Sequence, residues 1–190
     1  MLSISNTGLD VGDRILAAAA SCVVNFGVDR VTLAEIARRA GVSRPTVYRR
    51  WADTPSIVAA LLTQRITDVL QDAPLHGEDR ESLVQQVVSV ANLLRHDELI
   101  MSVMHSHLAS TYITERLGQS QQMLIDALAD RLRVAQRHGS VRAGDPLQMA
   151  TMVLLIAQST IQSERIVHPI LDAGALATEL THALNGYLAP

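Results

Sequence analysis

Residues 32 to 51 read TLAEIARRAGVSRPTVYRRW, and this stretch decides the fold. Thr32 and Glu35 form a T-x-x-E pattern, a capping box that predicts the start of a helix. Apolar residues then recur at helical spacing as far as Gly41, which can adopt the left-handed conformation that ends a helix. Ser43 next provides an N-cap, followed by a proline in the first turn of a second helix. The stretch therefore predicts two short helices joined by a tight turn.

The second helix of this pair concentrates cationic and hydrogen-bonding side chains on one side. Val47 and Trp51, four residues apart, share an inward face, which leaves the polar residues outside. Such a helix suits the major groove of DNA, where arginine binds guanine and hydroxyls reach base edges or phosphates. A solvated hairpin with scattered arginines is the alternative, but caps, glycine, spacing and charge all favour DNA binding. The predicted contacts are Thr32, Ser43, Arg44, Pro45, Thr46, Tyr48 and Arg49.

The stretch from 13 to 62 resembles the DNA-binding domain of the tetracycline-repressor (TetR) family of transcriptional regulators. The residues that carry the resemblance are Arg14, Ile15, Leu16, Ala18, Gly27, Thr32, Ile36, Ala37, Ala40, Gly41, Val42, Ser43, Thr46, Val47, Tyr48 and Trp51. The resemblance implies an all-helical homodimer that represses promoters and releases DNA when a small molecule binds. The rest of the chain matches the family only in size and helical character.

One position departs from the family pattern. Family members commonly carry a lysine near the start of the fourth helix, where it contacts a phosphate, and this chain has Thr54 there. The resemblance implies that Thr54 is a DNA contact through its hydroxyl. The phosphate contact would then be weaker than in those relatives, or Arg49 and Arg50 would take it over.

Helical periodicity continues along the chain and predicts an all-α fold of about nine helices. Beyond the short pair, we expect helices at about 10–26, 54–73, 80–95, 97–109, 111–138, 146–166 and 172–188. An N-terminal three-helix helix-turn-helix DNA-binding domain is predicted at 1–53. A C-terminal helical bundle for effector binding and dimerisation is predicted at 54–190.

Charge is divided unevenly along the 190 residues. Residues 1–65 hold eight arginines against five acids, and residues 66–190 hold eight against fourteen. The positive part coincides with the proposed DNA-binding part. Cys22, the single cysteine, excludes an intramolecular disulfide and is expected to be a buried, inert thiol. No secretory signal or apolar run long enough to span a membrane is evident, so a cytoplasmic protein is expected.

The helix expected at 146–166 is apolar nearly all round, which predicts burial on all sides. One side would face the core and another a second subunit, so that this helix and the last one make a four-helix interface. Two recognition helices in a dimer suit a near-palindromic operator. The alternative is a central helix of a monomer. The predicted interface residues are Met152, Leu154, Leu155, Leu176, Leu180, Leu184 and Tyr187.

A mostly apolar effector cavity is expected in the C-terminal part, chiefly on the strength of the family resemblance. Methionines adapt to irregular ligands, although they also fill ordinary cores. The predicted lining is Met101, Met104, His105, Leu108, Met123, Leu155, Gln158 and Gln162. A regulator without such a cavity, controlled by a protein partner or by no ligand, is the alternative.

Metal, cofactor and enzymatic chemistry are not predicted. His105 and His107 lie two apart, so on a helix they point to different faces and cannot easily share a metal ion. No cofactor is expected. Paired carboxylates, a nucleophile–base set and a phosphate loop are also lacking, so the chain is not expected to be an enzyme.

Overall fold

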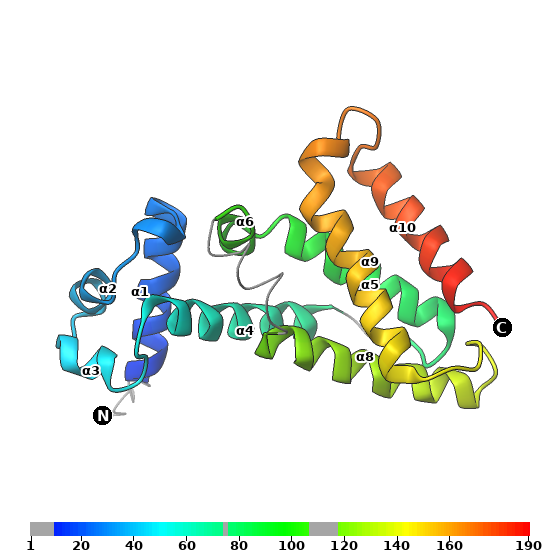
Figure 1. Ribbon diagram of the computed structural model, residues 1–190, viewed down its shortest axis with the longest axis horizontal. Coiled ribbons are helices and arrows are strands. Elements are labelled where there is room, and N and C mark those ends of the chain that lie inside the picture. Colours follow the sequence, from blue (N-terminus) through cyan, green and yellow to red (C-terminus); the bar gives the residue numbers. More distant parts are fainter. Residues whose placement is uncertain (1–9, 74–75, 107–117) are drawn as a thin grey trace, which may run out of the picture.

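The computed structural model describes residues 10–73, 76–106 and 118–190. These residues form nine α-helices and one 3-10 turn, which confirms the predicted all-helical fold. They are α1 (Val11–Phe26), η1 (Val28–Arg30), α2 (Leu33–Ala40), α3 (Arg44–Tyr48), α4 (Thr54–Asp72), α5 (Arg80–Arg95), α6 (Glu98–Met104), α8 (Gln119–Arg137), α9 (Pro146–Val167) and α10 (Ala173–Leu188). Helices α1 to α3 gather at one end, and α4 leads from them to the bundle of α5, α8, α9 and α10 (Figure 1).

Two helix boundaries differ from the sequence-based expectation. The helix predicted at 97–109 ends at Met104, where the chain tightens into a turn: the Ser106 amide and the Ser106 hydroxyl both donate to the Val103 carbonyl, at 3.0 and 2.7 Å. The helix predicted at 111–138 includes Gly118, but the backbone at Gly118 is extended (φ −73, ψ 162). Helix α8 therefore begins at the next residue, Gln119. Residues 107–117 lie outside the described part.

The first hydrophobic core holds the N-terminal helices together. Its buried side chains come from α1, η1, α2, α3, the first half of α4 and also α6. Cys22 is fully buried there, and burial raises the pKa of its thiol, which is what an inert cysteine requires. Leu99 and Val103 of α6 belong to this core, so a helix from the second half of the sequence packs directly on the N-terminal helices.

The second core lies between α5, α8, α9 and α10, with the end of α4 along its edge. Helix α4 therefore contributes to both cores, through Ile57, Val58 and Leu61 in the first and Val69 in the second. The domain division at 53/54 stays a prediction, with α4 as the element that joins its two parts. In the described residues, no helix combines the length and apolarity needed to span a bilayer.

Candidate nucleic-acid interface

The N-terminus of α2 is capped as predicted, but only from one side. The Thr32 side chain accepts a hydrogen bond from the Glu35 amide at 3.2 Å. The Glu35 carboxylate does not return to Thr32, so the capping box expected from the sequence is half formed. The reason is competition, because two arginines of the same helix bind that carboxylate instead.

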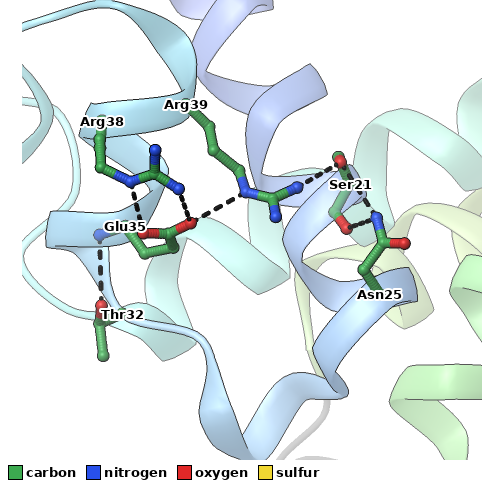
Figure 2. A network of polar contacts seen from close by, with 6 residues as sticks. All are labelled: Ser21, Asn25, Thr32, Glu35, Arg38 and Arg39. Carbon is green, nitrogen blue, oxygen red and sulfur yellow. Dashed lines mark hydrogen bonds and ion pairs between the residues drawn. The ribbon is translucent and has the colours of Figure 1, made fainter.

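Glu35 is the centre of a polar network on α2 (Figure 2). Arg38 donates to it twice, from Nη2 at 2.6 Å and from Nε at 2.9 Å, and Arg39 donates from Nε at 3.0 Å. These hydrogen bonds, Arg38 first, lower the pKa of Glu35 to about 2. Arg39 also donates to the Ser21 hydroxyl at 2.9 Å and lies 4.6 Å from the centre of the Phe26 ring. Arg39 thereby ties α2 to α1, and Glu35 stays ionised at neutral pH.

Helix α3 presents the polar residues that the sequence predicted. The Ser43 hydroxyl caps it, accepting from the Thr46 amide at 3.4 Å, and the two hydroxyls lie 2.8 Å apart. Val47 is fully buried and fixes the inner face. On the outside, Tyr48 is 53% exposed. Arg44, Pro45 and Arg49 are also exposed, and Thr46 is half-buried.

Two residues near α3 are already engaged within the protein. The Thr54 hydroxyl donates to the Val31 carbonyl at 3.4 Å and is half-buried. Arg50 pairs with Asp10, with Nη1 3.2 Å from Oδ2. The Gly12 amide and then Arg50 lower the pKa of Asp10, which also caps α1. Of the two arginines expected to replace the family's lysine charge, Arg50 is therefore held on the N-terminus of α1.

Arg44 and Arg49 are different, because neither makes an ion pair in the residues that the structure describes. Arg44 borders a surface hollow of about 410 Å³ between α2 and the start of α3. The hollow is lined by Thr32, Ala34, Glu35, Ala37, Arg38, Val42 and Arg44. Sequence reasoning missed Arg38, although its i, i+4 spacing from Ala34 places both on one side of α2.

The predicted effector residues do not gather in one place. Met101 and Met104 are half-buried against the second core, and the Met123 sulfur lies 3.7 Å from the Thr67 hydroxyl. Leu155 is 56% exposed, and Gln162 is exposed on the same outer face of α9. These two cannot line a cavity inside the protomer.

The other predicted effector residues differ in exposure. Gln158 is half-buried and His105 is exposed. Leu108 lies outside the described residues. No cluster of three potential metal ligands occurs in the part of the chain that is described.

The predicted dimer residues fall into two layers. Leu176, Leu180 and Leu184 of α10 are buried within the protomer's own core, so they do not form an outer surface. Helix α9 has one face buried in the protomer core and another face exposed to solvent in the single protomer, so its burial on all sides stays a prediction that depends on a second subunit. The exposed apolar residues of α9 are Leu147, Met152, Leu155 and Ile166, and Leu154 and Tyr187 are half-buried.

Comparison with known proteins identifies the N-terminal pattern. A family model described as "Bacterial regulatory proteins, tetR family" matches residues 15–61. An uncharacterised HTH-type transcriptional regulator of Mycobacterium tuberculosis (strain H37Rv) is 73% identical over 188 residues, which is 99% of this chain and 100% of that relative. Both are regulators rather than enzymes, in agreement with the sequence-based expectation.

Solved structures share the fold at low sequence identity. The fatty acid degradation regulator FadR from Bacillus halodurans superposes with a TM-score of 0.69 at 15% identity, covering 95% of this chain and 97% of that one. FadR from Bacillus subtilis, solved in complex with stearoyl-CoA, gives a TM-score of 0.67 at 17% identity, covering 92% and 98%. The similarity extends over both hydrophobic cores.

Proposed function

The chain belongs to the TetR family of helix-turn-helix transcriptional regulators, and from this premise we propose that it is a homodimeric repressor of a near-palindromic operator. A small apolar or amphipathic effector releases it from DNA. The observation that carries the proposal is the exposure of Arg44 and Tyr48 on a helix whose opposite face is fixed by the buried Val47.

In this proposal α3 enters the major groove. Arg44 binds guanine through its guanidinium, and the Tyr48 hydroxyl donates to a phosphate oxygen. Thr32, exposed at the N-terminus of α2, offers its hydroxyl to a second phosphate. Because the Thr54 hydroxyl is committed to Val31, Arg49 takes the phosphate role expected near the start of α4.

Dimerisation uses the outer face of α9 together with α10. Leu147, Met152 and Leu155 are exposed there, and this part of the face carries no charged side chain. An uncharged patch with exposed leucine and methionine is typical of a surface that a second subunit covers. Leu176, Leu180 and Leu184 support this surface from inside as part of the protomer core.

Effector control operates through α6. The half-buried Met101 and Met104 of α6 face the second core, while the Ser102 hydroxyl donates to the Val23 carbonyl of α1 at 3.2 Å. A ligand that displaces α6 therefore displaces α1 as well, and the separation of the two DNA-binding heads changes. Ligand and operator then oppose each other by linkage. The acyl ligand of FadR from Bacillus subtilis, which has the same fold, makes fatty acyl compounds the first class to test.

A two-step assay tests this function. Melting temperatures are measured with fatty acyl, aromatic and cationic compounds, and every compound that raises the melting temperature is added to the protein bound to a fluorescent operator. The proposal requires that stabilising compounds release the operator. If stabilising compounds leave the DNA affinity unchanged, or if no compound of any class binds, control by a protein partner is favoured instead.

A further inference from the structure

We propose that Arg38 of α2 is a direct contact to the DNA backbone: Glu35 holds it in the free protein, and it transfers to a phosphate in the complex. The inference rests on the proposed DNA-binding function and extends it to a residue outside the recognition helix. The hollow between α2 and the start of α3 brings the relevant groups together: Arg38 and Arg44 contribute positive charge there, and Thr32 contributes a hydroxyl.

Arg38 is free to turn toward a ligand. Its side chain is 71% exposed, so reorientation loses little buried surface. Its hydrogen bonds in the described residues go only to Glu35, three positions earlier on the same helix. An exposed i, i+3 ion pair of this kind adds little stability. A phosphate on a highly charged duplex is therefore a strong competitor for the guanidinium.

Glu35 does not lose its neutralising partner when Arg38 leaves. Arg39 still donates to the same carboxylate at 3.0 Å. The Arg39 guanidinium also donates to the Ser21 hydroxyl and lies over the Phe26 ring, so this side chain stays beside Glu35. The two arginines thus have separate roles: Arg39 keeps the carboxylate balanced beside DNA, and Arg38 is the mobile cation.

The direction of the helix favours a phosphate near its N-terminus. Side chains on a helix lean toward the N-terminus, so Arg38 extends over Ala34, which is too small to block it. Both residues line the hollow, and Thr32 lies at its N-terminal rim, where the helix dipole attracts an anion. In helix-turn-helix proteins the first helix of the pair crosses the DNA backbone, which is where this phosphate would lie.

The salt dependence of operator binding tests the inference, because each phosphate contact adds about 0.9 to the slope of log affinity against log salt. The full chain is titrated by fluorescence anisotropy against one operator fragment over roughly 50 to 200 mM salt. In a two-fold dimer, Arg38→Ala should lower the slope by about 2 and weaken binding to every DNA sequence by the same factor. Arg38→Gln keeps a hydrogen bond to Glu35 without the charge and should lower the slope by the same amount. It provides the test if the alanine variant folds poorly.

Two further variants separate a phosphate contact from a structural role. Arg38→Lys keeps the charge and loses the two-pronged hydrogen bond to Glu35, so it should retain the wild-type slope. Arg133→Ala is the matched control, because Arg133 forms an i, i+3 ion pair with Asp130 at 2.5 Å on α8, and it should also leave the slope unchanged.

An unchanged slope in folded Arg38→Ala and Arg38→Gln would overturn the inference, as would a loss confined to one base pair, which indicates a base contact. If the wild-type chain binds no duplex at all, the proposed function itself fails. If the wild type binds and only the Arg38 effect is missing, the function stands without this contact.

Discussion

Arg65 on α4 donates from Nε to Oδ2 of Asp97 at 2.5 Å. The Asp97 side chain is only 7% exposed, and its other oxygen accepts from the Ile100 amide at 2.9 Å to cap α6. The hydrogen bond to Asp97 raises the pKa of Arg65. One carboxylate therefore joins α4, which connects the two cores, to α6, which packs on α1.

Removing the cation from this pair should destabilise the protein more than removing a surface partner. Arg65→Ala leaves a buried carboxylate without its cation, and we expect a loss of about 1–3 kcal/mol in the free energy of unfolding. Arg133→Ala breaks an exposed pair and should cost about 0–1 kcal/mol. Urea denaturation of both variants measures the difference. Equal losses would show that the Arg65–Asp97 pair is merely a surface contact.

On α3, we expect Arg44 to contact a base and Tyr48 to contact the DNA backbone. Arg44→Ala should weaken operator binding by about 1–3 kcal/mol and relax the preference at one base pair, because a two-pronged contact to guanine is lost. Affinities for the operator and for single-base variants of it provide the measurement, with circular dichroism as the check on folding. A uniform loss on all sequences would assign Arg44 to a phosphate.

Tyr48→Phe removes a hydroxyl from a side chain that is 53% exposed, so it should change the fold little. We expect weaker binding on specific and nonspecific duplexes alike, because a phosphate contact carries no sequence information. Full retention of affinity on both kinds of duplex would rule out the hydroxyl as a DNA contact.

The two layers of the proposed dimer interface should respond differently. Leu155→Glu places a charge on an exposed side chain and should reduce the solution mass from dimer to protomer while helicity is kept. Leu184→Ala acts on a fully buried side chain and should lower the free energy of unfolding by about 2–5 kcal/mol. Light-scattering mass and thermal melts separate the two effects. A dimer that tolerates Leu155→Glu would place the interface elsewhere.

Acid should weaken the α2 network within a defined window. Folding lowers the pKa of Glu35 from 4.5 to about 2. The ionised network therefore contributes its full stabilisation of the fold above pH 4.5. That contribution is lost as the pH falls through the folded-state value. The difference in unfolding free energy between wild type and Glu35→Gln should therefore be constant above pH 4.5. Below pH 4.5 it should change progressively to the disadvantage of the wild type. A difference independent of pH down to about 2 would contradict the pairing.

The sequence predicts the helix–turn–helix well because its signals are local. Gly41 has the left-handed conformation expected of it (φ 65, ψ 35), and Ser43 caps α3. These features depend on residues within one turn of each other. Helices with strong caps, such as α5 after Asp79 and α9 after Asp145, also begin where the sequence predicts.

Features that depend on competition or on tertiary packing are harder to predict. Glu35 had both a backbone partner and two arginines within reach, and only the three-dimensional arrangement selects the arginines. The Thr54 hydroxyl turns to Val31, which is distant in sequence. Periodicity identifies the apolar face of α10 but does not tell whether Leu180 meets its own core or a second subunit.

The most direct test measures how many protomers of the full chain bind one DNA site and where in the genome that site lies. Fragments of the source genome are selected at low ionic strength, and the complexes are weighed in solution. We predict two protomers, or a multiple of two, on a near-palindromic site whose half-sites lie about 34 Å apart. A chain that remains a single protomer and binds no double-stranded fragment would contradict the account.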